Sequence, residues 1–102
     1  MRLSVYPAAR ADMDSAQDWY DQAQPGLGEE FTDELVQAFE LLARQPHVGS
    51  RRYAHLLEGG NLRFWALDRF PFLVFYQVQD DALAVLRVLH ERRDIQSAWG
   101  SH

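Results

Sequence analysis

The sequence contains no cysteine and no lysine, and none of its apolar runs is long enough to cross a membrane. The lack of cysteine excludes a disulfide scaffold and a thiolate metal site, but it does not fix the cellular compartment. Near the N-terminus the only apolar stretch is Leu3 to Tyr6, which stops at Pro7 and is too short for a signal peptide. We therefore expect a soluble, cytoplasmic protein with no membrane partner.

The charges that are present divide the chain into two halves of opposite sign. All ten basic residues are arginine, and the net charge is −5. Residues 1–43 hold two arginines against nine acids, whereas residues 44–102 hold eight arginines against six acids. Arginine is the planar donor suited to bidentate contact with carboxylate or phosphate. A genome rich in arginine codons would explain the missing lysine equally well, but it explains the asymmetry less well.

Residues 8–45 are predicted to form two helices joined by the Pro25-Gly26 break, as an antiparallel hairpin. The first helix carries its aspartates, Asp12, Asp14, Asp18 and Asp21, largely on an exposed face. Apolar residues repeat at helical spacing in both segments. In the first helix they are Ala9, Met13, Ala16, Tyr20 and Ala23, and in the second Leu27, Phe31, Leu35, Ala38 and Leu42.

The rest of the chain is predicted to be mainly strand. Residues 1–6 form a short first strand, residues 51–90 a β-meander, and residues 91–102 a tail with a short helix or no regular structure. Within the meander, Arg51–Leu56 is a weak strand, Leu62–Phe70 a stronger one, and the runs Phe72–Val78 and Ala82–His90 are apolar enough to be central strands. With 47% hydrophobic residues in 102 positions, we expect a single α+β domain over residues 1–102, an antiparallel twisted sheet with the hairpin on one face.

No motif indicates a metal, a cofactor or a nucleophile. The histidines have no ligand spacing, and no serine lies in a nucleophile elbow. We therefore expect no metal and no cofactor. The four scattered histidines are His47, His55, His90 and His102.

A cationic cluster follows the last strand and leaves two interpretations open. RNA cleavage by 2′-hydroxyl attack needs a base, an acid and a cation, and His90, Tyr76 and the arginines could supply them. The net negative charge opposes binding of a polyanion. Alternatively, Arg87 pairs with an acid at the sheet edge and His90 bonds to backbone. The candidate cations are Arg63, Arg87, Arg92 and Arg93.

The two helices also carry large aromatic side chains. Tyr20, Phe31 and Phe39 fit a core position, whereas Trp19 lies at the margin of its apolar stripe. An exposed tryptophan beside an apolar stripe is typical of a site for a protein partner.

The sequence resembles the ParE branch of the RelE/ParE superfamily of bacterial toxins from type II toxin–antitoxin systems. The likeness covers nearly the whole chain and is strongest from Phe70 to Asp94. Upstream, Trp19-Tyr20, the Pro25 break, Phe31 and the stop from Pro46 to Gly49 are also similar. The residues that carry the strongest match are Phe70-Pro71-Phe72, Tyr76, Val88-Leu89-His90, Arg92, Arg93 and Asp94.

This resemblance implies a βααβββ fold and a non-enzymatic toxin that poisons DNA gyrase. It also implies a ParD-like antitoxin that wraps and neutralises the toxin in a hetero-oligomer. RelE-like enzymes instead carry lysine and arginine on their middle strands, where this chain has Leu73. The runner-up is a ribosome-dependent mRNA endonuclease, and the third alternative is a non-toxic member that only binds its antitoxin.

The expected sites follow from these considerations. We expect no sequence-specific nucleic-acid binding by the toxin alone, and we expect the antitoxin segment that reaches the arginines to be acidic. The candidates for antitoxin binding are Trp19, Tyr20, Leu27 and Phe31. The candidates for contact with the toxic target are Arg63, Arg87, His90, Arg92, Arg93 and Trp99.

Overall fold

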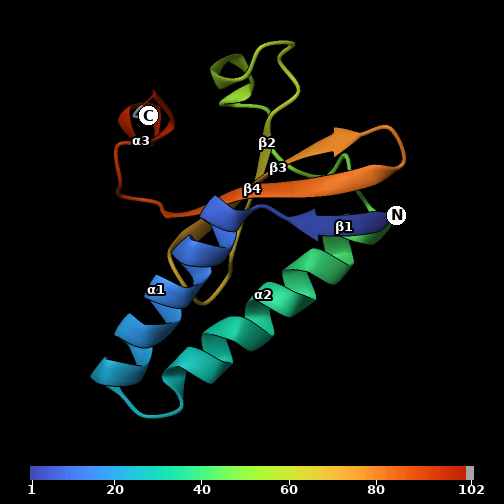
Figure 1. Cartoon of the computed structure of the whole chain (residues 1–102). Coiled ribbons are helices and arrows are strands. Elements are labelled where there is room, and N and C mark those ends of the chain that lie inside the picture. The colour runs from blue at the N-terminus through green and yellow to red at the C-terminus, as the bar shows by residue number, and fades with distance from the viewer. Residues whose placement is uncertain (101–102) are drawn as a thin grey trace.

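Helices α1 and α2 cover one face of a four-stranded sheet in the computed structural model, which describes residues 1–100 (Figure 1). The predicted order of strand, two helices and three strands is confirmed, with short helices added in the loops. The elements are β1 (Arg2–Val5), α1 (Pro7–Ala23), α2 (Leu27–Arg44), the 3-10 helix η1 (Ala54–Leu56), β2 (Arg63–Ala66), β3 (Phe72–Gln79), β4 (Ala82–His90) and α3 (Ile95–Gly100).

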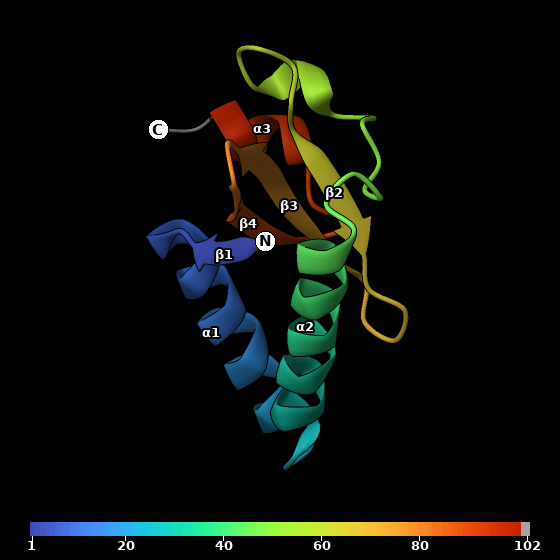
Figure 2. The ribbon, with the colours of Figure 1, turned by 90° about the vertical axis from the view of Figure 1, so that its right-hand side faces the viewer.

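The predicted helical hairpin is confirmed, and its ends have clear local causes. Pro7 opens α1, where a missing N–H costs nothing. Gly26 turns the chain with a φ of 91°, a left-handed conformation that favours glycine. Glu29 and Glu30 lie in the first turn of α2 and Arg44 in its last, as the helix dipole favours. The joined end of the hairpin extends well beyond the sheet (Figure 2).

The sheet has the order β1-β4-β3-β2, and it differs from the prediction at one strand. The meander β2-β3-β4 is antiparallel throughout. The first strand, however, pairs in parallel with β4, from Arg2 opposite Ala82 to Val5 opposite Val85. The sheet is therefore mixed rather than wholly antiparallel. Alternation of apolar residues identifies a strand, but it does not specify which neighbour the strand chooses or in which direction it runs.

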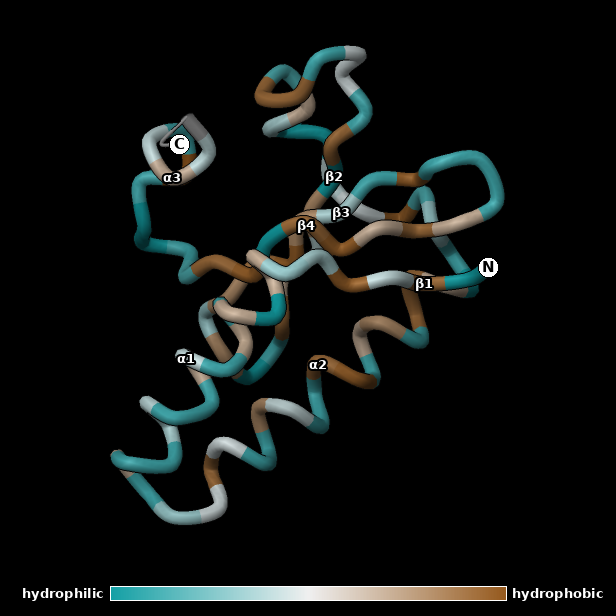
Figure 3. Tube along the Cα trace, viewed as in Figure 1, coloured by the Kyte–Doolittle hydropathy of each residue, from teal (hydrophilic) through white to brown (hydrophobic). Residues whose placement is uncertain are grey.

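The central strands β3 and β4 are buried on both faces, as their apolar runs predict. One face packs against α1 and α2 through side chains such as Phe31, Val74 and Val85. The other face packs against η1 and α3 through Phe75, Leu86 and Ile95. Hydrophobic residues accordingly concentrate along β3, β4 and the inner side of α2, whereas the hairpin tip is largely hydrophilic (Figure 3).

Two predicted strands need correction. Arg51–Leu56 is not a strand: a turn leads into η1, and only Ser50 forms an isolated bridge, with Phe64. In this conformation Tyr53, Leu56 and Leu57 pack against the hydrophobic cluster on the face of the sheet that also contacts α3. The strand predicted over Leu62–Phe70 is limited to Arg63–Ala66 because Leu67 already turns back toward β3 and donates its N–H to the Phe72 carbonyl.

The predicted tail over residues 91–102 contains α3, and its last two residues, including His102, lie outside the described residues. None of the helices in the described chain is both long and apolar enough to span a membrane.

Candidate functional site: a groove beside helix α1

A groove of about 640 Å³ lies between α1 and the ends of β3 and β4. We call it the α1–β4 groove. Its walls are mainly apolar, and they come from three separate parts of the chain. Lining residues are Asp12, Ser15, Ala16, Trp19 and Tyr20 of α1, Pro71 and Phe72 at the start of β3, and Val88, Leu89, His90 and Arg93 at the end of β4 and beyond.

Trp19 is the most exposed large hydrophobic side chain of the described residues. It is 66% exposed, and its ring packs edge-on against Tyr20 at a centroid distance of 5.2 Å. The structure therefore confirms the expectation that Trp19 lies outside the core. An indole that borders an apolar groove while facing water is poised to lose much of that exposure when a partner docks.

The other predicted antitoxin contacts are mostly buried. Phe31 is 0% exposed and Tyr20 is 9% exposed, because both rings pack with Phe70 and Phe72 in the core between the sheet and the helical hairpin. Leu27 is half-buried against the same cluster. Phe31 as a direct antitoxin contact stays a prediction, and in this conformation its ring is covered because helical spacing places it on the inner side of α2. Tyr20 still lines the groove.

His90 ends β4 with its ring fixed from two sides. Its Nδ1 accepts a hydrogen bond from the Arg92 N–H at 3.1 Å, and its ring contacts Phe72 edge-on at 5.2 Å. The alternative that His90, at the end of a strand, hydrogen-bonds to the backbone is therefore confirmed. Arg92 and Arg93 follow in an exposed turn, and in the described structure neither pairs with a carboxylate. One guanidinium group without a carboxylate partner, that of Arg93, thus lines the groove, and Arg92 precedes it in the chain.

Arg87 is held in place by Asp12. Its Nε and Nη2 donate to the two carboxylate oxygens at 2.8 and 3.0 Å, and the Val88 N–H donates to Asp12 Oδ2 at 2.9 Å. The hydrogen bonds to Asp12 raise the pKa of the Arg87 guanidinium, while partial burial opposes the rise. Asp12 thus accepts the N–H of Val88 on the edge of β4, beyond the part of that edge that pairs with β1. The alternative that Arg87 pairs with an acid at the sheet edge is confirmed.

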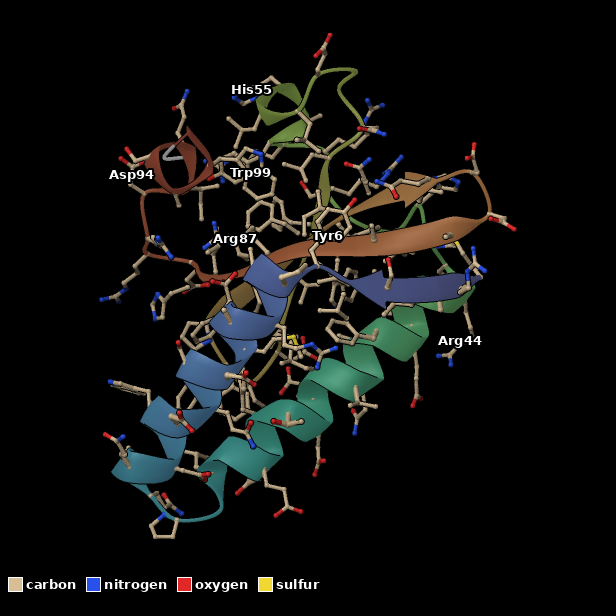
Figure 4. All side chains as sticks on the ribbon, viewed as in Figure 1. Tyr6, Arg44, His55, Arg87, Asp94 and Trp99 are labelled. Carbon is tan, nitrogen blue, oxygen red and sulfur yellow. The ribbon has the colours of Figure 1, made fainter. Side chains whose placement is uncertain are left out.

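Arg63 and Trp99 lie away from the groove. Arg63 starts β2 and donates from Nη1 to the carbonyls of His47 and Gly49, both at 3.0 Å. Trp99, on α3, packs over Phe75 on the opposite face of the sheet (Figure 4). The six candidates for contact with the target therefore do not lie together in the structure, and their role stays a prediction. Only His90 and Arg93 line the groove, with Arg92 next to them in the chain, because arginines spaced along different strands reach different ends of the sheet.

Several groove residues carry no signal of their own in the sequence. Asp12, Ser15 and Ala16 precede Trp19 at helical spacing and so lie on the same side of α1. Helical spacing from Trp19 is therefore sufficient to predict that these three residues line the same groove. Pro71 and Val88 become groove residues only because the sheet brings the start of β3 beside the end of β4. Within residues 1–100, no group of three or more histidine, aspartate or glutamate side chains is placed to hold a metal ion.

Acid should loosen α3 from the sheet. The Asp94 carboxylate accepts hydrogen bonds from the Ser97 N–H and hydroxyl at 3.2 and 2.8 Å, and these bonds lower the Asp94 pKa. A depressed folded-state pKa contributes stability that is present above the ordinary aspartate pKa and is lost as pH falls through the folded value, here below about pH 4. Trp99 fluorescence, read with Trp19 and Trp65 replaced by Phe, should report the loss. In the Asp94→Asn variant the change at low pH should be absent.

Comparisons with known proteins agree with this arrangement. The sequence profile of the family described as ParE toxin of type II toxin-antitoxin system, parDE, matches residues 3–95. A solved structure described as the chromosomal ParDE TA system from P. aeruginosa is similar in fold, with a TM-score of 0.73. It is 22% identical in sequence, and the match covers 88% of this chain and 95% of that one. None of the curated proteins matches the sequence. Since the profile spans nearly the whole chain, the protein belongs to the ParE toxin family of type II toxin–antitoxin systems.

Proposed function

We propose that this ParE toxin arrests growth by poisoning DNA gyrase without catalysing a reaction, and that a ParD-like antitoxin neutralises it in the cytoplasm. The proposal that the protein is not an enzyme is supported by the small number of free cationic side chains on the middle strands of the sheet. Strand β3 carries none, and Arg87 on β4 is occupied by Asp12. A phosphate-clamping set across the middle strands, which an RNA-cleaving member would need, is therefore incomplete.

The α1–β4 groove is the best candidate for the antitoxin. An amphipathic helix docks by laying apolar side chains into such a groove. Here Trp19 and Phe72 offer apolar contact, and Arg93 offers charge at one end. We infer an antitoxin segment with apolar residues facing Trp19 and an acidic residue reaching Arg93. Such a segment would also cover Arg92 and Arg93 and so separate them from the target.

Replacing Trp19 by alanine should weaken antitoxin binding by roughly tenfold or more, because exposed tryptophans at the centre of interfaces are common hot spots. Isothermal titration of the purified toxin with its antitoxin measures the change. Val36→Ala is the matched control, since Val36 is 47% exposed but lies on α2 outside the groove. Equal affinity of the Trp19 variant and wild type would move the docking site elsewhere.

Replacing Arg92 and Arg93 together by glutamine should abolish most of the toxicity. Each arginine lacks a carboxylate partner in the described chain, so neither removal costs the fold an ion pair. A charge-assisted hydrogen bond contributes roughly 1.5–3 kcal/mol, so losing two should reduce gyrase inhibition by about a hundredfold or more. Supercoiling and cleavage assays with purified gyrase measure this effect. The control is the pair Arg2→Gln and Arg10→Gln, and full inhibition by the Arg92/Arg93 variant would overturn the assignment.

The broader proposal is tested by pulse-labelling DNA and protein synthesis in cells after the toxin is induced alone. A fall in DNA synthesis first, with double-strand breaks, supports gyrase as the target. A fall in translation first would favour the endonuclease alternative and make His90 a catalytic candidate. If folded toxin accumulates and neither process slows, the protein is a member that binds its antitoxin and poisons nothing.

A further inference from the structure

A second cavity lies over the end of β3, away from the α1–β4 groove. It has a volume of about 330 Å³, and its walls come from the loop that follows α2 and from the segment that precedes β2. We call it the arginine pocket. Its lining residues are His47, Arg51, Asn61, Arg63 and Val78. Arg63 is one of the candidates for contact with the target, but the proposed function does not use this pocket.

Both arginines in the pocket are held in place by backbone carbonyls. Arg63 Nη1 donates to the carbonyls of His47 and Gly49 at 3.0 Å each, and Arg51 Nη2 donates to the Gly60 carbonyl at 2.7 Å. A guanidinium has five N–H donors, so these bonds fix each head group and leave most of its donors free. Less side-chain freedom is then lost when an anion binds.

The wall that carries His47 is itself fixed by a buried hydroxyl. Tyr76 is 0% exposed, its hydroxyl donates to the Pro46 carbonyl, and the Gly49 N–H donates to it, both at 2.9 Å. A methyl group at Gly49 would collide with the Tyr76 hydroxyl and come within 2.9 Å of the Phe64 carbonyl, so the contact requires glycine. Burial raises the pKa of the Tyr76 hydroxyl, while the Gly49 hydrogen bond and the nearby Arg63 charge oppose the rise. The loop that carries His47 is therefore anchored to β3 on both sides of that residue.

The charge of the pocket is uncompensated. Residues 44–63 contain four arginines and a single acid, Glu58. None of the lining residues is acidic. The described chain has two salt bridges, Arg69 with Glu30 and Arg87 with Asp12, so neither Arg51 nor Arg63 pairs with a carboxylate. A concave site lined by one sign of charge concentrates counter-ions.

We propose that the arginine pocket binds a phosphate group. Two guanidinium groups, an imidazole and an amide surround it from two separate loops, so donors approach from several directions. A tetrahedral phosphate presents three or more oxygens that point in different directions, whereas a carboxylate presents two oxygens in one plane. The phosphate comes either from a nucleic-acid backbone or from a small free anion. This inference does not depend on gyrase being the target.

Titration of the ¹⁵N-labelled full chain with inorganic phosphate, and separately with a short DNA duplex, tests the proposal. The side-chain Nε–H signals of Arg51 and Arg63 should shift with phosphate, and those of Arg10 should not. Sodium acetate at equal ionic strength is the carboxylate comparison. Tighter binding of the duplex than of phosphate assigns the ligand to a nucleic-acid backbone, whereas a response to phosphate alone assigns it to a small anion. Both outcomes support the pocket.

The informative variant is Asn61→Asp, which places a negative charge in the pocket and leaves both arginines on their carbonyls. Asn61 is exposed and makes no side-chain hydrogen bond within the described chain, so the fold should be unaffected. Phosphate affinity should fall by about tenfold or more. Gln22→Glu makes the same charge change on the exposed side of α1 and should leave affinity unaltered. Unshifted arginine signals, an equal response to acetate, or an Asn61→Asp variant that binds like wild type would each overturn the proposal.

Discussion

Replacing Phe31 by alanine should lower the free energy of unfolding by about 3–5 kcal/mol. The ring is fully buried, with centroids 5.3 Å from Tyr20, 5.3 Å from Phe70 and 5.2 Å from Phe72. It therefore joins α2, α1 and the β2–β3 turn in one aromatic cluster, and its loss leaves a cavity that these neighbours cannot easily fill. Urea denaturation followed by circular dichroism measures the change.

The control for size is Phe31→Leu, which keeps most of the volume and should cost less than about 1.5 kcal/mol. The prediction also separates core from interface. At a temperature where the Phe31→Ala variant is still folded, its affinity for the antitoxin should stay near that of wild type, unlike Trp19→Ala. A large loss of affinity with unchanged stability would mean that Phe31 leaves the core when the antitoxin binds.

Replacing Asp12 by alanine should destabilise the toxin by roughly 2–4 kcal/mol. The change removes a bidentate partner from Arg87 and leaves its guanidinium without a counter-charge. It also removes the acceptor of the Val88 N–H on the β4 edge. Both partners are partly buried, with side-chain exposures of 23% for Arg87 and 14% for Asp12, so water can replace the lost bonds only in part. Thermal and chemical unfolding measure the loss.

Two further variants isolate the cause. Asp14→Ala removes an exposed acid two residues further along the same helix, on another side of it, and should change stability by no more than about 0.5 kcal/mol. Combining Asp12→Ala with Arg87→Leu should recover part of the lost stability, because the unpaired charge is then absent. If Asp12→Ala were as stable as Asp14→Ala, the pair would contribute little and Arg87 would be free for the target.

Sequence periodicity was sufficient for most of the fold. The helices were predictable because apolar residues recur at helical spacing between Pro7 and Arg44, and β3 and β4 because their apolar runs are long. The parallel pairing of β1 with β4 depends on contacts between the two ends of the chain, which local patterns do not encode. The segment around η1 is not predictable from its pattern, because apolar residues at Tyr53, Leu56 and Leu57 fit a short helix as well as a weak strand.

The candidate site was predictable only in part, and for a similar reason. The exposure of Trp19 was predictable because it lies at the margin of the apolar stripe on its helix, where the core does not cover it. The contact of Asp12 with Arg87 was not predictable, because Asp12 is one of four aspartates on α1 and its sequence context does not distinguish it from a solvent-facing acid. Its role depends on where α1 crosses the β4 edge. Asp21 is similar, since its carboxylate accepts the Gly28 N–H at 2.9 Å and so closes the hairpin.

The parallel pairing of β1 with β4 has a consequence for the rate and order of folding. The helical hairpin and the β3–β4 hairpin use contacts between neighbours in sequence, so they can form early. Strand β1 pairs Arg2 with Ala82, and its docking requires closure of a loop that contains almost every other element. Until β1 arrives, the edge of β4 from Ala82 to Val85 lacks a partner strand. Unpaired strand edges in partly folded chains recruit other chains, so newly made toxin should be most prone to aggregation before its first strand is in place.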